Sequence, residues 1–339
     1  MEKRFVAGLD IAKDKFDVSI KVKKEDGSLA IKGSSHFSND KEGFDKFLAW
    51  VFKRTKGENN GLHILMEATG VYYEELAHYL YEQQIRVYVV LPNKVRNYLR
   101  SLNIKTKTDK TDAHLLAQMG FEQTLTPWKP MSGQYIELRD LTRAILALQK
   151  DLVIIKSRLH ALLYSKNKSE RVRNIYEREI AFIEKSIEEL RKERKKLTDK
   201  DPMLKEKIKN LTTIKGVGFD TAIGIIAETN GFELFTSQRQ LVSYAGLDVS
   251  HNQSGTKTRA SHISKKGNAR IRHLLFMPAI SAVAYNKPIR LLHQRIKERN
   301  PKHPIKGVVA GMRKLLLQIY TLYKKGQPFD EDYKWGKEI

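Results

Sequence analysis

The fold of the first part of the chain is decided by two stretches, FVAGLD at residues 5–10 and FDVSIKV at residues 16–22. The first is a short apolar run that ends at a carboxylate, Asp10, and is typical of a buried strand. In the second, apolar and polar residues alternate, which is the period-2 pattern of a strand. Asp26-Gly27 then marks a turn, so residues 29–37 are expected to form a third strand.

Beyond these strands, helical and strand patterns alternate. We expect buried strands over residues 61–66 and 87–91, and helices over 40–51, after Thr69-Gly70, over 95–102 and over 111–121. An α/β ribonuclease-H-like domain begins with three strands, and helices and strands then alternate. The chain shows this order, and we place the domain at residues 1–127. The order alone does not separate this fold from other α/β folds.

Residues 132–200 have a different pattern, a coiled-coil seam in two parts separated by a polar break. Two long helices of this kind either fold back as a hairpin or pair between protomers. We therefore predict an assembly region and a homo-oligomer, either a dimer or a tetramer. The apolar residues of the seam are Leu138, Leu141, Ile145, Leu148, Leu152, Ile155, Leu159 and Leu162, then Tyr176, Ile180, Ile183, Ile187, Leu190 and Leu197.

Residues 205–339 are expected to form a mainly α-helical C-terminal domain, and they hold much of the basic excess. Their net charge is +14, from 24 basic and 10 acidic residues, out of +23 for the whole chain. The stretch LTTIKGVG, residues 211–218, followed by an apolar helix, resembles a helix-hairpin-helix element that binds phosphate through backbone N–H groups. A tight turn without any ligand is the alternative for this stretch.

Composition narrows the choice of partner. A pI near 9.8 favours a polyanion, and no apolar run approaches the roughly 20 residues that span a bilayer, so we expect nucleic acid and no membrane. The absence of cysteine excludes disulfides, thiolate zinc sites and cysteine nucleophiles, and it fits a reducing cytoplasm. We expect no signal peptide, because charges flank the first short apolar run.

Four carboxylates form the strongest candidate site. Asp10 and Glu67 end buried strands, and Asp109 and Asp112 are three residues apart at the start of a predicted helix, which puts them on one face. In a ribonuclease-H-like sheet the first and fourth strands are neighbours. Four converging carboxylates repel one another unless cations lie between them, and oxygen ligands in that number suit one or two Mg²⁺ ions.

Each of these carboxylates taken singly has a simpler explanation. An Asp at the end of a strand often caps the next element, and Asp109 or Asp112 is placed to cap the helix that follows. The strand, strand, helix order of all four favours the metal site. Asp14 and Asp17 fall in a turn and at an outward strand position, so we assign them as solvated or capping residues.

A second candidate site is a serine in a basic, glycine-containing segment. Between Ser254 and Arg272 there are six basic residues and no acidic one, which predicts a phosphate-binding surface. A serine hydroxyl becomes a useful nucleophile only beside a base, a metal or a charge cluster. From the residues alone, Ser250, Ser254, Ser261 and Ser264 remain open as nucleophile, cap or phosphate contact. The six basic residues are Lys257, Arg259, Lys265, Lys266, Arg270 and Arg272.

Several stretches together resemble one family. GLDIAKDKFDV, LMEATGVYYEELA, TKTDKTDAHLLAQM, IKGVGFDTAIGIIAE, YAGLDVSHNQSG and ISKKGNARIRHLLF, in this order, are similar to the DEDD-type transposases of bacterial insertion sequences. The resemblance implies a RuvC-like N-terminal domain and a C-terminal transposase domain. It implies that Asp10, Glu67, Asp109 and Asp112 are the acidic site, and that Ser254 joins DNA covalently. It also implies a non-coding bridge RNA that chooses donor and target.

Two other functions remain open. A metal-dependent nuclease of Holliday-junction type needs only the carboxylates and water, with Ser254 as a phosphate contact. A non-enzymatic nucleic-acid scaffold leaves four acidic residues in a basic protein unexplained. A membrane-surface protein is disfavoured, because the basic residues alternate with Gly, Ser and Thr and not with a strong apolar face. We therefore expect a cytoplasmic bacterial enzyme that associates with the nucleoid when it acts.

Overall fold

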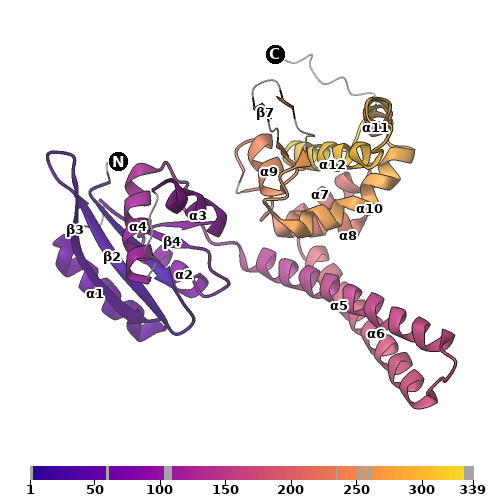
Figure 1. Cartoon of the computed structure of the whole chain (residues 1–339), viewed down its shortest axis with the longest axis horizontal. Helices are drawn as coiled ribbons and strands as arrows, with labels where there is room; N and C mark the ends of the chain where they lie inside the picture. Colours follow the sequence, from indigo (N-terminus) through magenta and orange to yellow (C-terminus); the bar gives the residue numbers. More distant parts are fainter. Residues whose placement is uncertain are drawn as a thin grey trace. The chain divides into compact units, whose positions relative to one another are not determined.

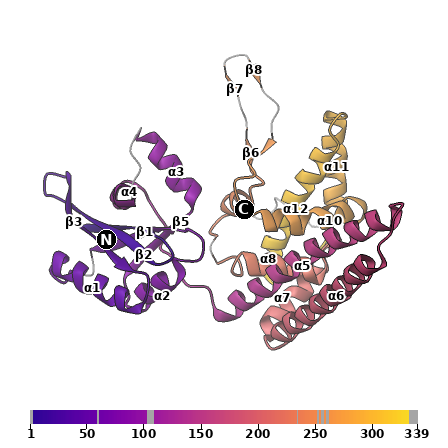
Figure 2. The same cartoon turned by 60° about the horizontal axis from the view of Figure 1, so that its bottom comes forward.

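A computed structural model of the chain describes residues 3–58, 61–102, 109–233, 235–250, 253–254, 257–258 and 262–331. The chain divides into two compact units, Met1–Pro130 and Met131–Ile339, and each is described by itself. Figures 1 and 2 show a mixed sheet with helices in the first unit and a mainly helical second unit. No helix in the described ranges is both long and apolar enough to cross a membrane.

The first unit contains a five-stranded sheet in the order β3-β2-β1-β4-β5. The pairs β1–β2 and β2–β3 are antiparallel, whereas β1–β4 and β4–β5 are parallel. This topology, three antiparallel strands extended by two parallel ones, confirms the predicted ribonuclease-H-like fold. The strands are β1 (Phe5–Ile11), β2 (Lys15–Lys23), β3 (Leu29–Ser38), β4 (Leu62–Glu67) and β5 (Arg86–Val90).

Helices cover both faces of this sheet. α1 (Lys41–Thr55) and α2 (Glu74–Glu82) pack on the face that carries the alternating apolar residues of β1 and β2. α3 (Pro92–Ser101) and α4 (Asp109–Glu122) pack on the opposite face, against Leu65 and Tyr88. Alternate residues of β1, β2 and β4 therefore point toward α4 and not into water.

In the second unit the two predicted seams pack against each other within one chain. α5 (Gly133–Tyr164) and α6 (Glu170–Asp199) form an antiparallel hairpin, in which Ile145 contacts Ile183 and Ile187 (Figure 1). Of the two arrangements expected from the sequence, the hairpin is therefore present. Pairing between protomers stays a prediction.

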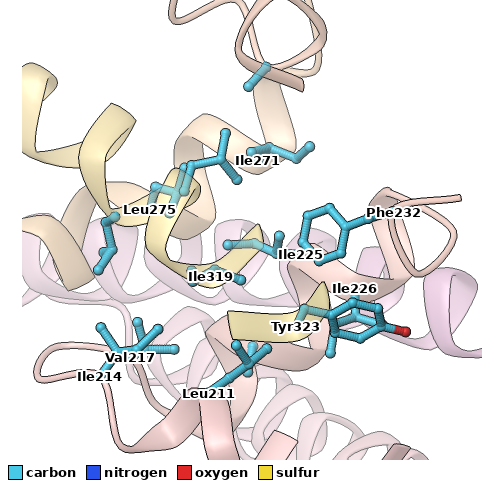
Figure 3. Packing of buried hydrophobic residues seen from close by; sticks show 14 of the residues in the cluster. Leu211, Ile214, Val217, Ile225, Ile226, Phe232, Ile271, Leu275, Ile319 and Tyr323 are labelled. Carbon is cyan, nitrogen blue, oxygen red and sulfur yellow. The ribbon is translucent and has the colours of Figure 1, made fainter. Parts of the chain in front are cut away.

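One apolar helix lies at the centre of the core of the second unit. α8 (Phe219–Glu228) is buried at every position from Thr221 to Glu228, and residues of α7, α10 and α12 pack against it (Figure 3). The other elements are α7 (Pro202–Thr212), α9 (Gln238–Tyr244), α10 (Ala269–Tyr285), α11 (Lys287–Arg299) and α12 (Ile305–Lys325), with the two-residue strands β6 (Val249–Ser250), β7 (Gln253–Ser254), β8 (Lys257–Thr258) and β9 (His262–Ile263).

The turn between α7 and α8 is used for packing. Gly216 has φ +102°, and a Cβ at this position would lie 2.7 Å from the carbonyl oxygen of Pro278 in α10. Val217 is buried, and Asp220 occupies the first turn of α8. Packing on α10 gives this glycine a structural role that needs no phosphate.

The close approach of α4 to β1 generates a prediction about Gly8. A Cβ at Gly8 would lie 2.2 Å from the backbone nitrogen of Ala117 and 2.3 Å from the carbonyl oxygen of Ala113. Because backbone atoms cannot move aside like a flexible side chain, Gly8→Ala should destabilise the first unit by about 1–3 kcal/mol. Hydrogen exchange in residues 109–122 should accelerate. Gly133→Ala, which adds a methyl group to open space, is the control, and unchanged exchange in Gly8→Ala would contradict this packing.

Candidate functional site

Asp10 and Glu67 lie side by side at one edge of the sheet. Leu9 pairs with Met66 in the parallel β1–β4 register, and each carboxylate is the next residue of its strand. Asp10 shares a face with Gly8, and Glu67 shares a face with Leu65, so both are on the side that α4 covers. Both residues are partly buried. The structure therefore brings together the two strand-end carboxylates that the sequence singled out.

The direction of α4 brings its first turn to the same edge. Ala113 and Ala117 lie against Gly8, whereas Gly120 lies against Val6. The helix therefore runs antiparallel to β1, and its N-terminal turn, from Asp109 to Asp112, lies toward the end of β1 where Asp10 is found. Asp112 is partly buried. The side chain of Asp109 lies outside the described residues, so its place in the site stays a prediction.

Asp17 is a carboxylate that the sequence interpretation left aside. It pairs directly with Asp10 across the antiparallel β1–β2 register and is on the same face of the sheet. Like charges at directly opposed positions are destabilising. Lys15 donates a hydrogen bond from Nζ to Oδ2 of Asp17 at 3.2 Å, which offsets part of that repulsion. Three carboxylates, on β2, β1 and β4, thus follow one another along the sheet edge.

Hydrogen bonds hold α4 on the sheet beside this edge. The His114 ring is within hydrogen-bond distance of two serines, with Nδ1 3.0 Å from Oγ of Ser19 and Nε2 3.3 Å from Oγ of Ser34. One turn later, Lys21 donates from Nζ to Oε1 of Gln118 at 2.9 Å. Burial lowers the pKa of Lys21. These contacts fix the position of α4, and with it the position of Asp112.

The donor chemistry of this edge fits a hard cation. Asp10, Glu67 and Asp112 offer carboxylate oxygens, which are the ligands that Mg²⁺ prefers. Within the described residues, no three His, Asp or Glu side chains are arranged as a set of metal ligands. The side chain of the fourth predicted ligand, Asp109, is not among them. The residues present thus fit Mg²⁺ by the chemistry of their side chains, and a metal site at this edge stays a prediction.

Ser254 lies in the second unit, in a pair of short hairpin strands. β6 pairs with β9, and farther along the same segment β7 pairs with β8 in the register that sets Ser254 opposite Lys257. We call residues 248–264 the serine arm; in Figure 2, β7 and β8 lie beyond β6 from the helices. The side chains of Ser254 and Lys257, and all of Arg259, lie outside the described residues.

The other predicted basic residues lie just after the arm. Lys265, Lys266 and Arg270 are exposed, as a phosphate contact requires. Arg272 has a structural role: its Nη1 donates to the carbonyl oxygens of Ala245 at 2.9 Å and of Gly267 at 3.2 Å. Nucleic-acid binding by this set stays a prediction, and for Arg272 these internal bonds compete with it.

Comparison with known proteins follows the same two-part division. A family model described as a transposase of the DEDD, IS110 type matches residues 7–167. A second model, described as the IS116/IS110/IS902 transposase family, matches residues 208–294. The chain is 31% identical to the pilin gene-inverting protein of Moraxella bovis, over 98% of this chain and 99% of that protein.

Two further comparisons are more partial. A transposase of the insertion sequence element IS1111A from Coxiella burnetii is 33% identical over 24% of this chain and 22% of its own length. Among solved structures, Thermus thermophilus RuvC bound to a Holliday junction substrate matches 37% of this chain and 99% of its own, at 12% identity and a TM-score of 0.28.

We call the end of the sheet that carries Asp10, Asp17 and Glu67 the acidic edge. The contacts of His114 lead to a prediction about it. His114→Ala removes both serine contacts and should cost about 1–2 kcal/mol of stability. The first turn of α4 should then exchange its amide hydrogens faster, and the cleavage expected of this edge should weaken. Ser34→Ala removes one of the two contacts, so its effect should be intermediate. If both variants exchange like the wild type, the histidine does not fix α4.

Proposed function

Because the chain belongs to the IS116/IS110/IS902 family of transposases, we propose that it cuts and rejoins DNA through a covalent bond to Ser254. The observation that carries the cleavage part of this proposal is the convergence of Asp10, Glu67 and the first turn of α4 on one sheet edge. The position of Ser254 in a basic hairpin, opposite Lys257, supports its role as the nucleophile.

In the proposed reaction the Ser254 hydroxyl attacks a phosphorus of the DNA backbone. The serine proton passes to a base, the bond between that phosphorus and one sugar oxygen breaks, and this oxygen takes up a proton from solvent, so the sugar leaves as an alcohol. Attack by a sugar hydroxyl of another strand reverses these steps and frees the serine. The phosphoserine keeps the energy of the phosphodiester, so no nucleotide cofactor is needed.

The acidic edge would hold Mg²⁺ in this reaction. Asp10, Glu67, Asp109 and Asp112 are the proposed ligands, and Asp17 lies next to them. When bound, the ion supplies Lewis-acid polarisation of phosphate oxygens. The residues themselves orient the site, because their strands and α4 are fixed by the packing at Gly8 and by the contacts of His114.

The basic residues after Ser254 would bind nucleic-acid backbone. Lys257, Arg259, Lys265, Lys266, Arg270 and Arg272 are the proposed phosphate contacts, and such contacts position a nucleic acid without reading its sequence. Sequence choice would then come from pairing with a bridge RNA, as it does in other guided systems. The Moraxella bovis relative is named for inverting pilin genes, and we propose DNA as the substrate here too.

The two units carry different parts of the proposed chemistry. The carboxylates belong to Met1–Pro130 and the serine to Met131–Ile339. We propose that a homo-oligomer, either a dimer or a tetramer, assembles the complete site through the α5–α6 hairpin. The alternative function, a junction-type nuclease, is favoured by one observation: the acidic edge is built within the first unit alone. That enzyme would use water and form no bond to the protein.

The serine assignment predicts a loss of covalent product. Ser254→Ala should abolish the protein–DNA adduct, because alanine has no nucleophile, while the affinity for DNA stays within about 3-fold of wild type. Denaturing gel electrophoresis of labelled DNA detects the adduct. Ser250→Ala makes the same change in β6 of the same arm and should leave the adduct in place. If the Ser254→Ala variant forms as much adduct as the wild type, Ser254 is not the nucleophile.

The acidic edge predicts metal-dependent cleavage. Asp10→Asn and Glu67→Gln should each lower strand cleavage by at least about 100-fold, because each removes a charged oxygen ligand. Chelation of divalent ions should abolish cleavage in the wild type, and added Mg²⁺ should restore it. Asp14→Asn, an exposed aspartate in the β1–β2 turn, is the matched control. If the Asp10→Asn variant cleaves DNA at the wild-type rate, Asp10 is not a metal ligand of this site.

A further inference from the structure

The base of the serine arm is a close crossing of two chain segments, residues 244–248 and 264–268. Backbone N–H groups of the second segment donate to carbonyl oxygens of the first: Ser264 to Asp248 at 2.9 Å, Lys265 to Gly246 at 3.1 Å and Asn268 to Tyr244 at 2.7 Å. The two backbones touch, because a Cβ at Gly267 would lie 2.4 Å from the carbonyl oxygen of Tyr244. These segments enter and leave the arm, so they fix its direction.

A buried carboxylate lies beneath this crossing. Glu228, the last residue of α8, has a side chain that is 0% exposed. It accepts hydrogen bonds from Nε and Nη2 of Arg143 in α5 at 2.7 and 3.0 Å, and from Nδ2 of Asn268 at 2.8 Å. The Tyr244 hydroxyl donates a hydrogen bond to the backbone carbonyl oxygen of Glu228 at 3.3 Å. Both segments at the base of the arm are thus attached to one residue.

The charge of Glu228 is kept by its partners. Burial raises the pKa of this carboxyl, whereas the hydrogen bonds from Arg143 and Asn268 and the positive charges of Arg143 and Arg270 lower it, so the pKa ends below its usual value. A buried charge that loses one partner is strongly destabilised, because the remaining charge has no compensation. Substitution of either partner therefore disturbs the base of the arm directly.

The side chain of Asn268 both caps α10 and binds Glu228. Its Oδ1 accepts from the backbone N–H groups of Arg270 at 2.9 Å and Ile271 at 3.3 Å, which caps α10. Its Nδ2 donates to Glu228. Aspartate caps a helix as well as asparagine does, but it has no donor and would place a second negative charge beside Glu228. The two tasks are therefore separable by experiment.

We propose that Glu228 and Asn268 are positioning residues for the serine step, because they hold the base of the serine arm on α8 and α5. This inference rests on the proposed nucleophilic role of Ser254. Ser254 is six residues beyond Asp248, and six residues of chain span at most about 20 Å, so a rotation of about 10° at the base moves a group at that reach by about 3 Å. Reacting groups need a placement within about 0.5 Å, so a small tilt is enough to stop the attack.

The test measures adduct formation by the full-length protein under single turnover at saturating DNA. Asn268→Asp and Glu228→Gln should each lower the adduct rate by about 100-fold, while the Kd for DNA changes by less than about 3-fold. The matched control is Asn286→Asp. Asn286 also caps a helix, α11, and its Nδ2 donates to Gln318 and not to a carboxylate. This control should lose stability and keep its adduct rate.

The double variant Glu228→Gln with Asn268→Asp reverses the polarity of the pair. The new amide at position 228 would donate to the new carboxylate at position 268, which still caps α10. The adduct rate should therefore recover at least about 10-fold over either single variant. This recovery shows that the two side chains act through their mutual contact, because two independent defects would add.

Three results would overturn the inference. The first is a wild-type adduct rate in Asn268→Asp. The second is an equal loss of rate in Asn286→Asp at equal loss of thermal stability, which would make the network purely structural. The third is a double variant no faster than the single ones. Wild type and Ser254→Ala are assayed in parallel: if wild type forms no serine adduct, the proposed function fails and this inference fails with it.

Discussion

The packing of α4 on β1 is the constraint on which the first unit depends. Gly8 lets the helix backbone approach the strand, and Gly120 does the same beside Val6. This contact sets the direction of α4, so the helix begins at the edge where β1 and β4 end. The carboxylates converge because of the backbone packing and need no contact with one another. Under the proposed function, this packing would hold the cation site in place before any cation is bound.

In the second unit, polar contacts hold the base of the serine arm. The serine arm is formed by two-residue strand pairs, which contribute little stability on their own. Its base is held by the crossing at Gly246 and Gly267, and below that by Glu228. Both units therefore contain a close backbone approach some residues away from a candidate functional group. The first does so with an apolar helix face, the second with a buried charge.

The sequence was sufficient for the elements of the first unit, because strand periodicity and the residues at strand ends are local signals. It was insufficient for Asp17. The alternation of Phe16 and Val18 correctly predicts that Asp17 lies on the face of the sheet opposite to theirs. The sequence alone suggests that this face is exposed to solvent. That face is covered by α4, and its covering depends on packing between distant segments. Glu228 was missed for a related reason: its partners Arg143 and Asn268 lie 85 and 40 residues away in the chain.

The two halves of the candidate site carry opposite charge, and this division has a physical consequence. The carboxylates of Asp10, Asp17 and Glu67 repel a phosphodiester, so DNA binding at this edge would require cations. The segment from Ser254 to Arg272, with six basic residues and no acidic one, attracts the same phosphate but offers no metal ligands. Neither charge pattern alone suits both binding and phosphoryl transfer. In the proposed mechanism, a phosphate held by the basic segment and presented to a metal-loaded edge would satisfy both requirements, so the separation of the two halves would make cutting conditional on their assembly.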